Sequence, residues 1–454
     1  MKIENQLISK YNVAVPRYTS YPTVPVWKDG ISVEKWKEVF VLQFQLHREE
    51  GISLYIHLPF CESLCTYCGC NKKITTNHSV EEDYMQTILK EWNIYTELMQ
   101  DPPIIRELHL GGGTPTFFSP SNLERLLKGI LEKAVVHPEH EFSFEGHPNN
   151  TTYAHLETLY HLGFQRVSFG VQDNDPVVQR IINRIQPVEN VRAVTEAARK
   201  IGYKSVNYDL IYGLPLQNKE RMEKTIMQSV ALRPDRIAFY SYAHVPWTSR
   251  GQRLFDETDL PSTEQKMELY QLAKQLFMEN GYEDIGMDHF ALPTDDLFIA
   301  RNNGTLHRNF MGYTTQKTAI LLGLGVSSIS DVGIAFAQND KTLHDYTAAV
   351  ENNELPVRKG YFLSEEDIAF RKYILNISCQ GKTNFNPAHL LLLEQYTFPI
   401  LAELYTDGLV NYNREGLTVT KLGLHFIRNI CSAFDLHLIR REGSNSEKLF
   451  SKAI

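Results

Sequence analysis

The chain has 454 residues, of which 43% are hydrophobic and 22% are charged, and its net charge is −8. This composition is that of a soluble globular protein with a large core, and the length suffices for two or three domains of about 100–200 residues each. The acidic balance and the lack of a Lys/Arg run argue against general nucleic-acid binding. The N-terminus lacks the apolar core of a secretory signal, so we expect a cytoplasmic protein with reduced thiols.

Residues 1–45 are expected to form an N-terminal extension. Its segment PRYTSYPTVPVW (16–27) contains three prolines, which exclude a long helix there. The segment has no helical or alternating period, so we do not expect it in a barrel core. Because it carries Arg17 and two tyrosines, it could close over an open site as a lid. The alternative is that it plugs the underside of the next domain and contributes to stability.

Residues 46–345 alternate short apolar runs with amphipathic stretches. The runs are mostly rich in β-branched and aromatic residues, as buried strands are, and span 53–58, 105–110, 141–146, 166–172, 205–213 and 236–243. Stretches of helical period lie between them at 80–98, 121–133, 153–162, 188–201 and 219–232. This order predicts an α/β domain with a parallel sheet and helices outside it. Six units are fewer than the eight of a closed barrel, so we expect a partial, laterally open (β/α)6 barrel.

The most apolar stretch of the chain lies at 318–337. It is interrupted by Asp331, three serines and several glycines, so it predicts buried strand and loop instead of a membrane span. Residues 346–454 are mainly helical in period, with a hairpin expected at 409–420. They predict a mainly helical C-terminal domain of winged-helix type, in which no catalytic cluster is visible.

The stretch PFCESLCTYCGC (59–70) follows the first predicted strand and carries four cysteines in ten positions: Cys61, Cys65, Cys68 and Cys70. Thiolates this close together suit an iron–sulfur cluster. A structural zinc site with His57 as an additional ligand is an alternative, although structural zinc usually takes two separated ligand pairs. A redox disulfide fits C-x3-C poorly, and inert buried thiols do not suit a polar loop. The spacing alone leaves the cluster and zinc open.

The spacing Cys61-x3-Cys65-x2-Cys68 resembles the signature of radical S-adenosylmethionine (SAM) enzymes. In that superfamily three thiolates hold three irons of a 4Fe–4S cluster, and the amino and carboxyl groups of SAM chelate the fourth iron. The resemblance implies one such cluster bound by these three cysteines, with Cys70 as a surplus thiol.

A longer set of motifs resembles the oxygen-independent coproporphyrinogen III oxidase family. The motifs are PRYTSYPT, SLYIHLPFC-x3-C-x2-CGCNK, LHLGGGTPT, GVQD, NYDLIYGLP, GMDHFA, LHRNFMGYTTQ and RNICSAFD. They run from Pro16 nearly to the C-terminus, so the resemblance covers almost the whole chain. Two positions depart from the family pattern: His147 stands where an aspartate is usual, and Met311 where many relatives have glutamine.

Three aromatic side chains are candidates for the cofactor site. Tyr55 and His57 share one face of the first strand, where core aromatics and a satisfied core histidine are equally reasonable interpretations. The resemblance implies that Tyr55 contacts the first SAM and that His57 lies close to the cluster as a candidate catalytic residue. It also implies that Tyr67 packs against the adenine; otherwise Tyr67 is a loop tyrosine with a buried ring.

Glycines and a glutamate follow the second and third predicted strands. A Gly-rich turn is most often only a tight turn, but glycine also lets backbone approach a ligand closely. The resemblance places Gly112, Gly113 and Thr114 against SAM and facing a second SAM molecule. Glu145 could accept a charge-assisted hydrogen bond from an ammonium group, and the resemblance assigns it to the first SAM.

The remaining candidates lie mostly at the C-terminal ends of predicted strands, where parallel α/β sheets build their active sites. Taken singly, each has an ordinary alternative as a surface arginine, a strand-end cap or a small core residue. The resemblance places four residues around the second SAM and one at the first. These are, in that order, Gln172, Arg184, Asp209 and Ala243, and Ile329.

The resemblance implies that a SAM-derived 5′-deoxyadenosyl radical drives the oxidative decarboxylation of two propionates of coproporphyrinogen III to vinyls, giving protoporphyrinogen IX. An acidic protein that takes a substrate with four carboxylates must concentrate positive charge locally. Arg17 and Arg308 are candidate clamps, and Arg308 and Cys70 join His57 as candidate catalytic residues. The implied partners are a one-electron reductant such as flavodoxin or ferredoxin and an unknown electron acceptor. We expect a monomer that binds no nucleic acid and no membrane.

Two alternative functions stay open. A radical SAM methyltransferase or haem-degrading relative would share the barrel, the cluster and the paired SAM sites. A haem chaperone would keep the cluster but make no vinyl product. The related chaperones usually carry phenylalanine at the position of Cys70, so Cys70 and the PRYTSYP motif favour the decarboxylase.

Overall fold

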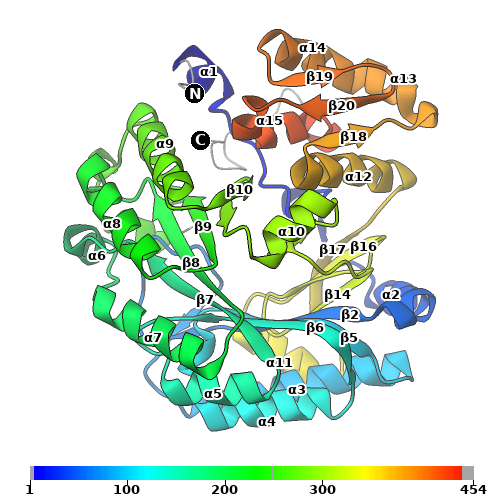
Figure 1. Cartoon of the computed structure of the whole chain (residues 1–454). Helices are drawn as coiled ribbons and strands as arrows, with labels where there is room; N and C mark the ends of the chain where they lie inside the picture. The colour runs from blue at the N-terminus through cyan, green and yellow to red at the C-terminus, as the bar shows by residue number, and fades with distance from the viewer. Residues whose placement is uncertain (1–4, 248, 442–454) are drawn as a thin grey trace.

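The computed structural model describes residues 5–247 and 249–441, and its centre is a curved parallel sheet (Figure 1). The six predicted strands are all present and lie side by side in chain order. They are β2 (Ile52–Leu58), β5 (Ile104–Gly112), β6 (Val135–Gly146), β7 (Phe164–Gln172), β8 (Ser205–Tyr212) and β9 (Arg236–Ser241). Each is parallel to its neighbour, so the expected partial barrel of α/β class is confirmed.

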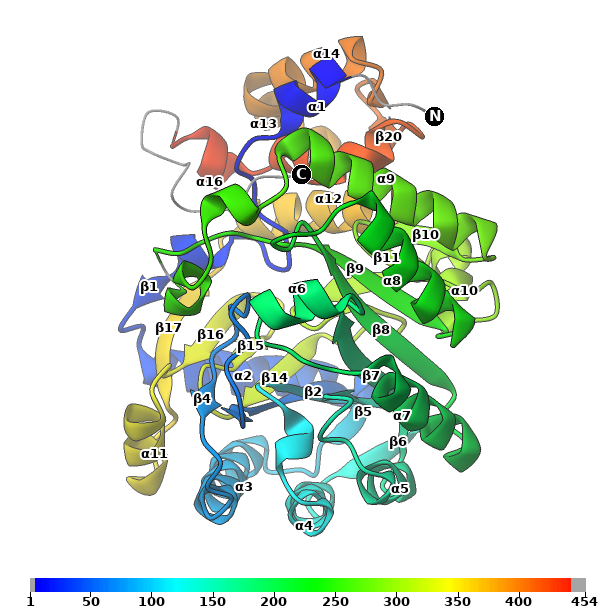
Figure 2. The same cartoon turned by 90° about the vertical axis from the view of Figure 1, so that its left-hand side faces the viewer.

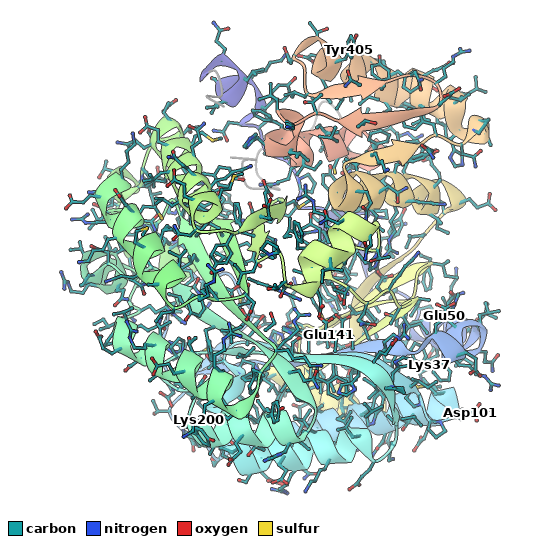
Figure 3. The ribbon with its side chains drawn as sticks, in the orientation of Figure 1. Lys37, Glu50, Asp101, Glu141, Lys200 and Tyr405 are labelled. Carbon is teal, nitrogen blue, oxygen red and sulfur yellow. The ribbon has the colours of Figure 1, made fainter. Side chains whose placement is uncertain are left out.

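The five predicted helices cover the outer face of this sheet (Figure 1). They are α3 (Val80–Met99), α4 (Pro120–Leu131), α5 (Tyr153–His161), α7 (Val188–Ile201) and α8 (Lys219–Ala231). In α4, the buried residues Leu123, Leu126, Leu127 and Ile130 recur at the spacing of one helical face. The helix begins where the Ser119 side chain accepts a hydrogen bond from the backbone N–H of Asn122. Lys200 of α7 lies accordingly on the outer rim of the molecule (Figure 3).

The apolar stretch at 318–337 supplies a seventh parallel strand. β14 (Ile320–Leu324) is fully buried and pairs in parallel with β2, on the side away from β5. The sheet then continues through the antiparallel strands β15 (Ile329–Asp331), β16 (Ala335–Asn339) and β17 (Val357–Phe362). The expectation of buried strand is confirmed. No helix in the described ranges has the length and hydrophobicity needed to span a bilayer.

Both expected domain boundaries fall inside helices. The boundary at 45/46 lies in α2 (Val33–His47), and the boundary at 345/346 lies in α11 (Leu343–Glu351). The large sheet extends beyond the second boundary through β17, whose edge pairs with β1 (Lys28–Asp29) from the N-terminal extension. The extension thus contributes a strand to the sheet.

The C-terminal part combines helices with a small antiparallel sheet. Its elements include α12 (Glu365–Gln380), β18 (Lys382–Asn384), α14 (Phe398–Thr406), β19 (Val410–Tyr412), β20 (Gly416–Val419), α15 (Ile427–Ser432) and α16 (Leu436–Ile439). β19 and β20 form the hairpin expected at 409–420. β18 pairs with β20 on the side away from β19.

The N-terminal extension lies between the C-terminal part and the barrel. Helix α1 (Asn5–Tyr11) lies beside the C-terminal elements in both views (Figures 1 and 2). The buried Tyr18 hydroxyl donates to Asp435 Oδ2 at 3.1 Å, and the Trp27 ring stacks on Phe336 with centroids 4.9 Å apart. This packing favours the stabilising role over a freely moving lid, because the aromatic side chains between the prolines are themselves core residues.

A buried carboxyl group links α3 to the loop after β14. Glu91 is fully buried and accepts hydrogen bonds from Gly325 N at 2.8 Å, Asn339 Nδ2 at 2.6 Å and the Tyr346 hydroxyl at 2.7 Å. Burial nevertheless raises the pKa of Glu91 to about 7, because its three donors only partly compensate for the lost hydration of the charged form.

We expect Glu91 to make the protein less stable as pH rises from about 4.5 to about 7. In that range the carboxyl ionises in the unfolded chain but stays protonated in the folded one, so unfolding is favoured. Glu91→Gln, which cannot ionise, should show a smaller fall in the free energy of unfolding across the same range. Denaturant titrations of both proteins at several pH values measure this, and equal slopes would contradict the expectation.

Candidate active site

A cavity of about 1040 Å³, counting space open to solvent, lies at the C-terminal ends of the parallel strands. It brings together twelve predicted site residues from the cysteine loop, the Gly-rich turn and the strand ends. These are Cys61, Cys65, Tyr67, Cys68, Cys70, Gly112, Gly113, Thr114, Glu145, Gln172, Arg184 and Asp209. Residues up to 148 positions apart in the sequence therefore form one site, as the strand-end rule predicts.

The four thiols of the cysteine loop differ in their environment. Burial raises the pKa of Cys61 to about 11, and the Thr114 hydroxyl donates to its sulfur at 3.4 Å. A hydrogen bond with Cys70, assisted by Lys72, lowers the pKa of Cys68 and raises that of Cys70. This shift favours the thiolate of Cys68, which is the form that ligates a metal.

The donor set of this loop suits iron better than a closed zinc site. Three thiols that line one cavity, with space beside them, match a cluster that keeps one open position. Among the described residues, no three His, Cys, Asp or Glu side chains are grouped so that they could hold a single metal ion. Lys72, which lies in the loop, donates to the carbonyls of Cys68 at 3.1 Å and Cys70 at 3.4 Å.

Tyr55 and His57 of β2 form a chain of hydrogen bonds that ends at Asn71, next to the last cysteine of the loop. His57 Nε2 lies 2.9 Å from the carbonyl of Asn71, and its Nδ1 lies 3.0 Å from the Tyr55 hydroxyl. A carbonyl can only accept, so Nε2 carries the proton and Nδ1 accepts from Tyr55. Burial lowers the pKa of His57, which agrees with a neutral ring. In this geometry both ring nitrogens are engaged, and His57 positions the loop.

The Gly-rich turn needs glycine at two positions. Gly112 has φ +118°, and a Cβ there would lie 2.9 Å from the His57 ring. A Cβ on Gly113 would lie 2.5 Å from the Pro59 carbonyl oxygen. The turn therefore packs directly on β2, and its Gly112 N–H donates to Glu145 Oε2 at 3.3 Å. Since the Glu145 side chain is about 45% exposed, its carboxylate is available to a ligand.

Arg184 and Asp209 also line the cavity. Arg184 Nη2 donates to the Gly170 carbonyl at 2.5 Å, and Nη1 lies 3.6 Å from Cys65 Sγ. Asp209 accepts from Ser168 at 2.9 Å and Asn207 at 2.9 Å, while burial raises its pKa to about 6. Gln172 ends β7 with φ +64°, which turns its side chain away from the strand's regular alternation.

The unusual His147 also lines the cavity. Burial, together with the neighbouring Arg184 charge, lowers its pKa to about 3, so the ring is neutral. Its Nδ1 accepts from Asn149 N at 3.1 Å, so local hydrogen bonding persists without the aspartate of the family pattern.

Five predicted site residues are not among the described residues that line this cavity: Tyr55 and His57, described above, and Ala243, Ile329 and Arg308. The Ala243 carbonyl accepts from Gln252 Nε2, which also holds the Tyr67 carbonyl at 3.0 Å. Ile329 begins β15, and Arg308 is buried in β12 (His307–Asn309).

Sequence reasoning missed Gln252, Lys72 and Tyr240. Gln252 braces the loop from a distant segment, which leaves no local signal. Lys72 could have been noted from its place two residues after Cys70, whereas Tyr240 lines the cavity with only the alternation of β9 to mark it.

Comparisons with known proteins agree with this geometry. Residues 55–228 match the family model of the Radical SAM superfamily. An oxygen-independent coproporphyrinogen III oxidase from Helicobacter pylori (strain 26695) is 38% identical over 462 residues, which cover 100% of this chain and 99% of that protein. The protein of the same name from Escherichia coli is 38% identical over 443 residues, or 95% of each chain. This chain belongs to the oxygen-independent coproporphyrinogen III oxidase family.

A solved structure confirms the fold of this family member over nearly its whole length. The Escherichia coli coproporphyrinogen III oxidase HemN, described as a radical SAM enzyme, superposes with a TM-score of 0.90 at 36% identity. The match covers 96% of this chain and 99% of HemN. Membership of the radical SAM superfamily implies a 4Fe–4S cluster and SAM as cofactors, and the resemblance found in the sequence is confirmed.

Proposed function

We propose that this chain is an oxygen-independent coproporphyrinogen III oxidase, which converts two propionates of coproporphyrinogen III to vinyls and yields protoporphyrinogen IX. The observation that carries the proposal is the match, over 95–100% of the chain at 38% identity, to proteins of that name. The cavity supports it, because three thiols, a glycine turn and an available carboxylate meet at the strand ends.

Cys61, Cys65 and Cys68 would hold the 4Fe–4S cluster, and Cys70 would remain off it. When bound, the cluster and SAM supply a carbon radical able to remove a hydrogen from the substrate's propionate. The chain's own residues bind and orient these groups. Glu145 is placed to accept a charge-assisted hydrogen bond from an ammonium, and the Gly112–Gly113 backbone allows close approach.

We assign the first SAM to one set of residues and a second SAM to another. The first set is Tyr55, Tyr67, Gly112, Gly113, Thr114, Glu145 and Ile329, and the second is Gln172, Arg184, Asp209 and Ala243, with the Gly112–Thr114 turn facing both. Support comes from Arg184 and Asp209, which line the same cavity as Glu145. His57 serves by positioning the cysteine loop.

The proposed partners follow from the same assignment. They are coproporphyrinogen III, a one-electron reductant of the flavodoxin or ferredoxin kind, and an electron acceptor of unassigned identity. We propose a monomer that works in the cytoplasm without nucleic acid or membrane. Arg17, whose guanidinium donates to the Ser241 carbonyl at 2.8 Å, and Arg308 would face the substrate's carboxylates.

The deciding experiment is anaerobic incubation of the reconstituted protein with coproporphyrinogen III, SAM and a chemical reductant, followed by mass analysis of the tetrapyrrole. Two vinyl groups in place of two propionates are expected. A methylated tetrapyrrole would indicate a methyltransferase, an opened ring a haem-degrading enzyme, and tight haem binding without turnover a chaperone. Any of these outcomes would overturn the proposal.

The second SAM site gives a separate prediction. Equilibrium dialysis should find two SAM molecules per chain in the unmutated protein. Asp209→Ala should weaken one of them about tenfold or more, because a charged hydrogen-bond acceptor is lost, and leave the cluster spectrum intact. Asp101→Ala, on the outer rim (Figure 3), is the control and should keep both. A stoichiometry of one in the unmutated protein would refute the second site.

A further inference from the structure

A second cavity continues from the first into the interior of the barrel. The two share Glu145, Asp209 and Tyr240, so they adjoin near the C-terminal ends of the strands. The inner cavity measures about 890 Å³, counting space open to solvent. Polar and charged side chains on the inward face of the strands line much of it, including Glu107, His109, Arg166, Asn207, Arg236 and His289. A barrel interior with this lining is built for a polar ligand, since apolar layers fill an ordinary barrel core.

Two buried arginines have unused donors here: Arg236, which lines this cavity, and Arg308, which lies against its lining residue Tyr313. Arg236 is 3% exposed, and its Nε donates to both oxygens of Asp295 at 2.7 and 2.8 Å. Its Nη1 and Nη2 find no hydrogen-bond partner among the described residues. Arg308 is 7% exposed, and its Nε and Nη1 are likewise without a partner there. Buried donors without acceptors are costly, and a ligand that supplies acceptors removes that cost.

Tyr313 places these groups in one neighbourhood. The Arg308 guanidinium lies 4.7 Å from the Tyr313 ring centroid, and the His289 ring lies 5.1 Å from it. His289 and Tyr313 both line the inner cavity, as does Arg236. His289 Nδ1 is also buried without a partner in the described part of the chain. Charges of Arg308, Arg236 and Arg17 add to burial in lowering the pKa of His289 to about 3.

The acidic groups nearby are already supplied with donors. Glu107 accepts from Ser53 and Thr314, both at 2.7 Å. Asp209 accepts hydrogen bonds from Ser168 and Asn207. Glu141, which Figure 3 labels near the middle of the view, forms an ion pair with Arg166. The groups without hydrogen-bond partners at this end of the cavity are thus mainly donors. A ligand that fits them needs oxygen atoms with several lone pairs.

We propose that Arg236 and Arg308, beside His289, form a binding site inside the barrel for a carboxylate of the substrate's propionate side chains. The inference rests on the proposed function, since it takes the ligand to be a porphyrinogen with four carboxylates. A carboxylate accepts up to four hydrogen bonds, and guanidinium groups present paired donors that match it. One propionate reaching inward would fix the macrocycle against the mouth of the barrel.

The test measures binding of two probes to the full chain with its cluster and SAM reconstituted. The probes are coproporphyrin III, an air-stable relative of the substrate, and its tetramethyl ester, which lacks the negative charges. Arg308→Gln should raise the Kd for coproporphyrin III roughly 30-fold, because one partner of a buried charged pair is removed. Its Kd for the ester should change much less. Arg308→Lys should recover part of the loss.

A second variant keeps the test independent of folding at position 308. Arg236→Lys retains a cation for Asp295 but loses the unpartnered terminal nitrogens, so it should also weaken coproporphyrin III binding selectively. Arg106→Gln is the matched control: Arg106 bonds His137 outside both cavities, and its variant should bind both probes normally.

Three results would overturn the inference. The first is unchanged coproporphyrin III binding in both variants, and the second is an equal loss of affinity for coproporphyrin III and its ester. The third is weakened SAM binding with unchanged porphyrin binding, which would assign the site to the carboxylate of SAM. If the unmutated protein turns over coproporphyrinogen III while the variants bind normally, only this inference fails. If the unmutated protein makes no vinyl product, the proposed function fails.

Discussion

Serine in place of Cys61, Cys65 or Cys68 should abolish the 4Fe–4S absorption of the anaerobically reconstituted protein, and with it all turnover. Each of these thiols lines the cavity, and the loss of one thiolate ligand leaves an iron without its protein bond. Cys70→Ser should keep the cluster. Cys70 is exposed, and its part is a hydrogen bond to Cys68, which a serine hydroxyl can replace.

Absorption and electron paramagnetic resonance spectra of the four variants, with iron and sulfide counted per chain, decide the matter. Cys70→Ser is the matched control, since it makes the same exchange in the same loop. Its turnover is expected to fall, because Cys70 is a candidate catalytic residue that lines the same cavity. If Cys70→Ser lost the cluster while one of the other three kept it, the ligand assignment would be wrong.

Deletion of residues 1–28 should give a protein that does not fold stably. Val15, Tyr18, Tyr21 and Trp27 are each at most 4% exposed. Burial of a large apolar side chain contributes about 1.5–3 kcal/mol, so four such residues approach the 5–15 kcal/mol by which whole domains are stable. The point variant Tyr21→Ala alone should cost about 3–5 kcal/mol, as core aromatic truncations do.

Denaturant titration followed by circular dichroism measures both effects. Val13→Ala provides the control, because Val13 lies in the same segment but is 48% exposed, and its change should stay within about 0.5 kcal/mol. A soluble truncated protein with the unmutated midpoint would show that the extension is not needed for folding and would restore the lid interpretation.

The sequence predicted the central barrel well because its signals are local. Each of the six strands is a short apolar run, and each helix between them has its own buried face, as α4 shows. The seventh parallel strand was less accessible. β14 appears in the sequence only as a continuous apolar run, and its parallel pairing with β2 depends on residues about 270 positions away.

The site was predicted unevenly for a similar reason. The spacing of the cysteines was enough to predict Cys61, Cys65 and Cys68 as ligands. The position of Asp209 at the end of a predicted strand marked it as a site residue. Nothing local indicated that both nitrogens of His57 are engaged within the protein, or that Arg308 lies against Tyr313 in the lining of the inner cavity. Those facts depend on which strands adjoin, so they required the tertiary structure.

Contacts between the N-terminal extension and the C-terminal helices can form only late in synthesis of the chain. Tyr18 finds its partner Asp435 417 residues later, and Arg428 donates to the Val15 and Pro16 carbonyls. At about 5–20 residues per second, roughly 20–80 s pass between the appearance of these partners at the ribosome. For much of that time, until β14 emerges, the nascent sheet has a free edge at β2. A chain terminated before Arg428 therefore lacks the residues that bind Val15, Pro16 and Tyr18. Truncation near the C-terminus should thus destabilise the N-terminal extension.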